Sequence, residues 1–308
     1  MFRNPVEAAV RVTAAVLLGA TFAACDITIG AAEVTVKEEK RFTVSGPTTL
    51  DLNTFDGSIQ VRGWDRHEVL VEVVKRGRDQ AIVDQITVSA TQQNGTIKVD
   101  VPRPAMAEAI SWGTSPSASL VVTAPVEAAL IARSGDGSIT LTRLSGKIEL
   151  RTDDGSIRIT DVKGDLTART GDGSVRAEAF EGHADIETGD GSVRLDGLLR
   201  GVRLDTQDGS VQVRVSSGST MDSDWSVTTG SGSMRVELPE SFSTELDATT
   251  GDGRIVIDDV RPAGARAERE GDDEDASRSR RSARVTLGSG GRTLTLRSGD
   301  GTITVRRR

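Results

Sequence analysis

The triplet Asp-Gly-Ser returns every 18 residues through the middle of the chain, starting at Asp136, Asp154, Asp172, Asp190 and Asp208. A fixed period of this size is typical of stacked repeats, in which each unit contacts only its neighbours. One such repeat is too short to enclose a hydrophobic core, whereas several repeats in register enclose a continuous one. The period therefore predicts an elongated repeat architecture.

Each repeat contains two short stretches that alternate as strands do. Ile157 and Ile159 alternate with polar residues, and Leu166 and Ala168 do so again after a Lys-Gly turn. Successive side chains of a strand point to opposite faces, so equivalent positions form rows along the stack. The predicted inner row is Ile139, Ile157, Val175, Val193 and Val211, and the predicted outer row is Arg158, Arg176 and Arg194.

These rows predict an all-β fold, a parallel β-helix or β-solenoid, whose 18-residue rungs lie about 4.8 Å apart. The hexapeptide apolar period of a left-handed triangular helix is absent from the sequence, so the right-handed form is favoured. Aromatic residues make up only 3% of the chain, which suits a core of small β-branched side chains. Gly201 follows Gly182 by 19 residues instead of 18, which predicts a bulge or a widened corner.

The sequence outside the regular array predicts longer strands and one charged insertion. Residues 40–132 are expected to form irregular N-terminal rungs, and residues 133–260 the regular repeat. The strands expected in the irregular part are residues 41–45, 48–53, 58–62, 68–75, 86–92, 96–101 and 120–123. Residues 261–284 run acidic and then basic, which predicts a disordered insertion, and residues 285–308 are expected to form the closing rung.

The first residues resemble an export signal that ends in a lipid-attachment site. An uncharged run over residues 12–24 is shorter than the about 20 residues needed to span a bilayer. It ends at Cys25, the single cysteine, in a pattern that resembles a bacterial lipobox. We expect a signal peptide over residues 1–24, a lipid on Cys25 and a tether over residues 25–39. The alternative is an ordinary secretory signal cut near Ala24.

Lipid attachment predicts a location at the bacterial cell envelope, facing the periplasm or the outside. Asp26, directly after Cys25, resembles an inner-membrane retention signal. The net charge of −8 argues against a nucleic-acid partner, which would require a concentrated basic face. The expected partners are therefore the membrane, through the lipid on Cys25, and a protein or glycan of the envelope.

The sequence contains no residue set typical of catalysis or of a metal site, and we expect no cofactor. A single cysteine excludes an internal disulfide and a Cys-rich metal site. The five Asp residues of the triplets would stack about 4.8 Å apart and repel one another. We expect each to accept the backbone N–H two residues further on and so to cap its turn. They are the candidate metal ligands, but one Asp per rung supplies fewer oxygen atoms than Ca²⁺ requires.

A carbohydrate-active β-helix, acting as a polysaccharide lyase or hydrolase, is the alternative function. A glycosidase needs two carboxylates in different environments, whereas the acidic residues of this chain are periodic. We therefore predict a non-enzymatic protein that presents repetitive surfaces to a partner. The candidate partner surface comprises Trp64, Trp112, Arg158, Arg176 and Arg194.

Four motifs, in this order, resemble a known family. They are FTV at residues 42–44, LDL at 50–52, DGSIQVRGWD at 56–65 and VLVE at 69–72. Together with the Gly-Asp-Gly-Ser repeats, they resemble the bacterial DUF4097 family of adhesin-like β-solenoids over nearly all of the mature chain. The resemblance implies an envelope location, a right-handed β-helical fold and no catalytic residues. It also implies a further alternative, an envelope-stress accessory protein that binds a membrane partner.

Overall fold

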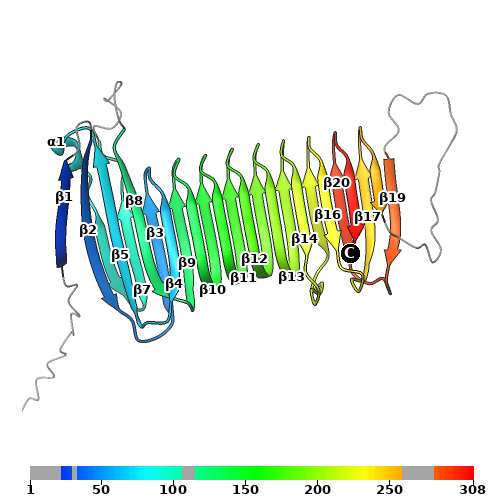
Figure 1. Cartoon of the computed structure of the whole chain (residues 1–308), viewed down its shortest axis with the longest axis horizontal. Helices are drawn as coiled ribbons and strands as arrows, with labels where there is room; N and C mark the ends of the chain where they lie inside the picture. The colour runs from blue at the N-terminus through cyan, green and yellow to red at the C-terminus, as the bar shows by residue number, and fades with distance from the viewer. Residues whose placement is uncertain (1–21, 30–32, 106–114, 259–280) are drawn as a thin grey trace, which may run out of the picture.

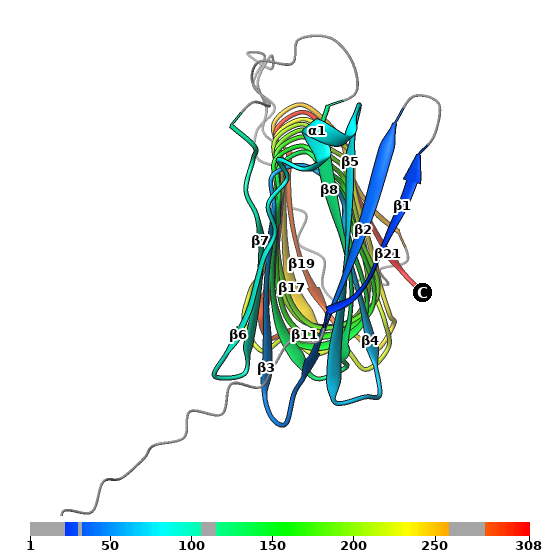
Figure 2. The ribbon, with the colours of Figure 1, turned by 90° about the vertical axis from the view of Figure 1, so that its left-hand side faces the viewer.

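The computed structural model describes residues 22–29, 33–105, 115–258 and 281–308, which form one elongated β structure (Figure 1). All 21 strands of these ranges belong to one continuous hydrogen-bonded sheet. Seen end-on, the sheet has two long facing arms (Figure 2). The helix found in these ranges, α1 (Gln80–Val83), is a single turn that begins at the cap Asp79. The all-β prediction is therefore confirmed.

The strands fall into an irregular N-terminal group, a regular middle and a C-terminal group. The first group is β1 (Phe22–Ile29), β2 (Val34–Thr43), β3 (Thr48–Thr54), β4 (Ile59–Trp64), β5 (Glu68–Gly77), β6 (Ser89–Gln93), β7 (Thr96–Val101), β8 (Ser117–Pro125) and β9 (Ala128–Ser134). The middle is β10 (Ile139–Thr152), β11 (Ile157–Thr170), β12 (Val175–Thr188) and β13 (Val193–Thr206). The last group is β14 (Val211–Val215), β15 (Trp225–Thr229), β16 (Met234–Leu238), β17 (Thr244–Thr250), β18 (Ile255–Asp258), β19 (Arg281–Leu287), β20 (Thr293–Ser298) and β21 (Ile303–Arg307). Each strand expected within residues 40–132 overlaps an observed one.

Strands β10 to β13 stack in parallel, with residues 18 apart side by side along most of their length. Ile157 pairs with Val175, and Val175 pairs with Val193. These three side chains are each 1% exposed, whereas Arg158 and Arg176, one residue further along, are exposed. The predicted inner and outer faces of these strands are therefore confirmed.

The 14-residue strands of the middle bend once, so that one strand supplies both arms of a rung. At the bend, Arg143, Asp161 and Ala179 have φ values of 56°, 54° and 51°, in the left-handed region. Gly164 has a φ of 120°, and a Cβ there would lie 2.1 Å from the carbonyl oxygen of Gly146. Glycine is therefore required at this corner for both its conformation and the close approach of the next rung.

The irregularity expected after Gly182 is present, but it is arranged differently. The register between β12 and β13 shifts once across the bend, between Ala177 and Phe180, and again between Gly182 and His183. Gly182 pairs with Leu199 and His183 pairs with Gly201, so Arg200 is the extra residue between them. Paired residues are 18 apart up to Ala177 and 17 apart from Phe180 to Gly182, and Arg200 restores the separation of 18. Gly201 is therefore not the counterpart of Gly182.

The order of strands in space differs from their order in the chain at both ends of the stack (Figure 1). Strand β3 lies between β7 and β9, and β4 lies between β8 and β10. In the C-terminal part, β20 lies between β15 and β17, and β21 lies between β16 and β18. The expectation that residues 285–308 close the stack is therefore corrected, because β20 and β21 form an interior rung. Their apolar side chains are buried on both sides by neighbouring rungs.

Antiparallel strands extend the sheet at both ends. Strand β5 pairs with β8, β2 with β5, and β6 with β7, while β19 pairs with β17. Residues 34–39, expected in the tether, thus belong to β2, and residues 281–284, expected in the insertion, belong to β19. Both segments form hydrogen bonds with backbone N–H and C=O groups that would otherwise be unpaired at the edges of β5 and β17. Residues 1–21 of the expected signal peptide and residues 261–280 of the expected insertion lie outside the described residues.

Candidate functional site

Buried hydroxyl groups hold the turns of the Asp-Gly-Ser triplets. The Oγ1 of Thr170 donates a hydrogen bond to the carbonyl oxygen of Gly155 in the preceding rung, at 2.9 Å. It also accepts one from the N–H of Gly173, in its own turn, at 3.3 Å. The same hydroxyl bond to a neighbouring rung is made by Ser134, Thr152, Thr188, Thr206, Thr229, Thr250 and Ser298. This inner hydroxyl row ties each turn to the next.

The aspartates of the triplets do not cap their turns, contrary to the expectation from sequence. The exposed side chains of Asp136, Asp154, Asp172, Asp190 and Asp208 form no hydrogen bond or ion pair within the described part of the chain. In three successive turns the N–H that an inner hydroxyl binds is that of the glycine directly after the Asp, namely Gly137, Gly155 and Gly173. The described residues contain no group of three or more His, Cys, Asp or Glu able to hold a metal ion.

The first acidic turn shows the electrostatic cost of this arrangement. Burial and the negative charge of Asp136 raise the pKa of Asp56, although Arg103 and the N–H of Gly57 act in the opposite direction. A raised carboxyl pKa means that the charged form is disfavoured in the fold. Ionisation of Asp56 therefore lowers stability as the pH rises through its folded pKa.

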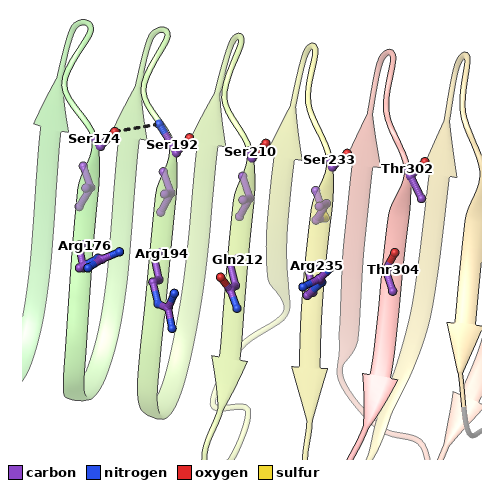
Figure 3. Close-up of a pocket in the computed structure, with 14 residues that line it drawn as sticks. Ser174, Arg176, Ser192, Arg194, Ser210, Gln212, Ser233, Arg235, Thr302 and Thr304 are labelled. Carbon is purple, nitrogen blue, oxygen red and sulfur yellow. Dashed lines mark hydrogen bonds between the residues drawn. The ribbon is translucent and has the colours of Figure 1, made fainter.

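A shallow groove of about 530 Å³ crosses β12, β13, β14, β16 and β21 on their outer face (Figure 3). One row of side chains along it, here called the outer hydroxyl row, is Ser174, Ser192, Ser210, Ser233 and Thr302. The second, here called the cationic row, is Arg176, Arg194, Gln212, Arg235 and Thr304. Each member of the second row lies two residues after one of the first, so both point to the same face of the strand.

Backbone pairing sets the spacing of the cationic row. Arg176 pairs with Arg194, Arg194 with Gln212, and Gln212 with Arg235. Neighbouring members are therefore one strand spacing apart, about 4.8 Å. Arg235 occupies this row although it stands 23 residues after Gln212, because residues 216–224 leave the stack and return. Arg235 therefore does not follow from the 18-residue period, although the sequence Ser231-Gly232-Ser233 just before it resembles the triplets of the other turns.

The groove is cationic and rich in free hydroxyl groups. No carboxylate is among its lining residues. Arg176 has Glu178 nearby, with 3.8 Å between Nε and Oε1, whereas Arg194 forms no ion pair with any described residue. Ser174 Oγ accepts a hydrogen bond from the N–H of Ser192 at 3.3 Å. The groove thus offers unpaired donors and acceptors in two parallel lines.

The structure brings together only part of the predicted partner surface. Arg176 and Arg194 lie in the groove, and Arg158 extends their row by one strand, since it pairs with Arg176. Trp64 lies on β4, away from the groove, and its indole N–H donates to a backbone carbonyl at 2.8 Å. Trp112 lies outside the described residues.

Cys25 lies within β1, whose backbone pairs antiparallel with β2. The register shifts between Ala23 and Asp26, so Cys25 stands at an irregularity of the pairing. Among the described residues, no helix combines the length and the apolar character needed to traverse a bilayer.

Comparison with known proteins places this architecture in a family. No curated protein matches the chain. Matching solved structures include a proposed cell adhesion protein from Clostridium sporogenes, at 11% identity over 88% of this chain and 100% of that chain, with a TM-score of 0.29. A proposed lipid-binding protein from Parabacteroides distasonis matches at 11% identity over 88% and 96%, with a TM-score of 0.39. A proposed adhesin from Bacteroides fragilis matches at 12% identity over 88% and 97%, with a TM-score of 0.34. The family model described as Toastrack DUF4097 matches residues 26–306, and the chain therefore belongs to this family.

Proposed function

We propose that the protein is a non-enzymatic, adhesin-like β-solenoid, right-handed with 18-residue rungs, that is anchored to the membrane and binds an extended ligand of the cell envelope. The observation that carries this proposal is the alignment of the outer hydroxyl row with the cationic row across five strands. Side chains that repeat at the strand spacing favour a ligand that is itself extended, because repeat proteins bind through long continuous surfaces. Many modest contacts along one line then supply the affinity.

The residues of the groove support binding over catalysis. Hydrolysis of a glycosidic bond requires a pair of carboxylates on either side of the bond. The lining residues described here include Ser, Thr, Arg, Gln, Val and Met, but no Asp, Glu, His or Cys. The groove is thus equipped to donate and accept hydrogen bonds, and it has no group suited to general acid or base catalysis at neutral pH.

Lipid attachment at Cys25 would hold this surface at the envelope. The family match begins at residue 26, directly after the single cysteine. Cleavage of the signal peptide before Cys25 would leave the backbone pairing of β1 with β2 intact from Asp26 to Ile29. The inner-membrane location suggested by Asp26 remains a prediction.

Cys25→Ala is expected to abolish membrane anchoring. Without a thiol to accept the diacylglycerol, the protein should move from the detergent phase to the aqueous phase, or stay unprocessed. Phase partitioning and mass spectrometry of the N-terminus measure this. Normal cleavage together with unchanged partitioning of the variant would rule out lipid anchoring at this position.

Filling the groove is expected to weaken binding to the envelope. Ser210 is exposed, lies at the middle of the outer hydroxyl row and forms no hydrogen bond through its side chain with described residues. Ser210→Trp should therefore leave the fold intact and obstruct the ligand, lowering affinity for isolated envelope fragments by about tenfold or more. Co-sedimentation of the protein with these fragments measures the change.

Ser217→Trp is the matched control, since Ser217 is exposed in the loop between β14 and β15 and outside the groove. Equal binding by the two variants would place the ligand elsewhere and overturn the proposed function. Release of reducing ends from the fragments would instead favour the carbohydrate-active alternative.

A further inference from the structure

The arginines of the groove favour an anionic ligand. Arg176, Arg194 and Arg235 line it together, and no carboxylate lies among the lining residues. A guanidinium group presents a planar set of donors that matches a carboxylate or a phosphate with two hydrogen bonds. Arg194 forms no ion pair with the described residues and is therefore available to a ligand. This local concentration of positive charge stands out on a chain whose net charge is −8.

The outer hydroxyl row favours a ligand that carries hydroxyl groups of its own. A serine hydroxyl both donates and accepts hydrogen bonds, as sugar hydroxyls do. The groove lies on the outer face of paired strands, so it offers no open strand edge to a peptide. Its lining residues include no aromatic ring on which the bases of single-stranded nucleic acid could stack. A glycan fits these features better than either of the other polymers.

The aspartates of the turns restrict the arrangement of charge on the ligand. Asp172, Asp190 and Asp208 are exposed and stand two residues before Ser174, Ser192 and Ser210, beyond the outer hydroxyl row. A second line of negative charge on the ligand would meet these carboxylates and be repelled. The groove therefore suits a polymer with its anions along one edge and its hydroxyls along the other.

We propose that the groove binds a linear acidic polysaccharide, with its carboxylates or phosphates on the cationic row and its hydroxyls on the outer hydroxyl row. This inference rests on the proposed function and names the class of ligand. Five strands span four intervals of about 4.8 Å, so the bound segment is roughly 19 Å long. Arg158 would extend the contact by one further interval.

The test titrates the full mature chain, in detergent micelles, with fluorescent polygalacturonate oligomers of defined length. The methyl-esterified oligomer is the uncharged control of equal shape. We expect the acid form to bind, with an affinity that falls as salt is raised, and the ester to bind at least tenfold more weakly. Poly(glycerol phosphate) carries phosphates and hydroxyls but no sugar rings, so tighter binding of that polymer than of the acid oligomer would overturn the assignment to a polysaccharide.

Arginine variants locate the contact. Arg194→Gln should weaken binding of the acid oligomer on the order of fivefold, the upper value for one exposed ion pair. The triple change of Arg176, Arg194 and Arg235 to Gln should weaken it on the order of a hundredfold if the three contacts are additive. Arg297→Gln is the control, because Arg297 is exposed on β20, outside the groove and without an ion pair among the described residues. It should leave the affinity unchanged.

The outcomes separate this inference from the proposed function. Equal binding of acid and ester, equal effects of Arg194→Gln and Arg297→Gln, or equal binding of single-stranded DNA would each overturn the acidic-glycan inference. In those cases the proposed function would stand if Ser210→Trp still blocked the envelope fragments. Loss of that effect would instead overturn the proposed function itself.

Discussion

Gly191→Ala should destabilise the fold by about 3 kcal/mol, the upper part of the range for inserting atoms where there is no space. A Cβ at this position would lie 2.1 Å from the carbonyl oxygen of Gly173 and 2.9 Å from the Oγ1 of Thr188. The first contact is with backbone, so two rungs would have to separate. The same carbonyl accepts the hydrogen bond from Thr188 at 2.9 Å, and this bond would be strained or lost.

Gly46→Ala is the matched control, because a Cβ there would meet no heavy atom within 4 Å. Its effect should stay within about 0.5 kcal/mol, as for most surface substitutions. Urea denaturation of both variants, followed by circular dichroism, compares the free energies of unfolding. Equal midpoints would show that the rungs can separate at the glycine turns without loss of stability.

Val175→Asp should cost about 4 kcal/mol, because it places a carboxylate where there is neither water nor a partner. Val175 is 1% exposed and lies between Ile157 and Val193 in the inner row. Each rung depends on its neighbours for most of its buried surface, so damage should spread to β11 and β13. Hydrogen exchange of these strands, together with urea denaturation, measures both effects.

Arg176→Asp is the control one residue away. The exposed Arg176 has one loose ion pair, with Glu178 at 3.8 Å, so stability should change by about 1 kcal/mol at most. Ligand binding should fall instead, since Arg176 belongs to the cationic row. Comparable loss of stability in the two variants would mean that the inner and outer faces have been assigned incorrectly.

The faces of the strands could be predicted from sequence because alternation alone determines them. Val175 and Arg176 are adjacent in the chain and must point in opposite directions in any strand. The hydroxyls that hold the turns were harder to recognise. Thr188 and Asp190 both recur with the period, and the pattern does not say which of them turns inwards. In the structure, Thr188 is buried and Asp190 is exposed.

The neighbours of each rung could not be predicted, and neither could the whole groove. The inner residues of different rungs are alike, as with the paired valines Val236 and Val305. The side chains of a rung therefore do not indicate which other rung lies next to it. The cationic row depends on the order of the rungs, because Arg235 lies beside Gln212 only after the chain has left the stack at residues 216–224 and returned. Local pattern predicts the direction of a side chain, whereas its neighbours across the sheet depend on the complete topology.

The interior position of β20 and β21 bears on how the protein is made. These strands leave the ribosome after β17 and β18, yet they separate that pair from β15 and β16. A growing chain therefore cannot add rungs in order of synthesis beyond β16, and β17 must wait for segments not yet translated. A truncated chain that ends before β20 lacks the rung formed by β20 and β21. The strands on either side of the missing rung, β15 and β16 on one side and β17 and β18 on the other, then have unpaired edges. The strand edges in the C-terminal part of the stack can therefore be buried only after the chain has been translated through β21.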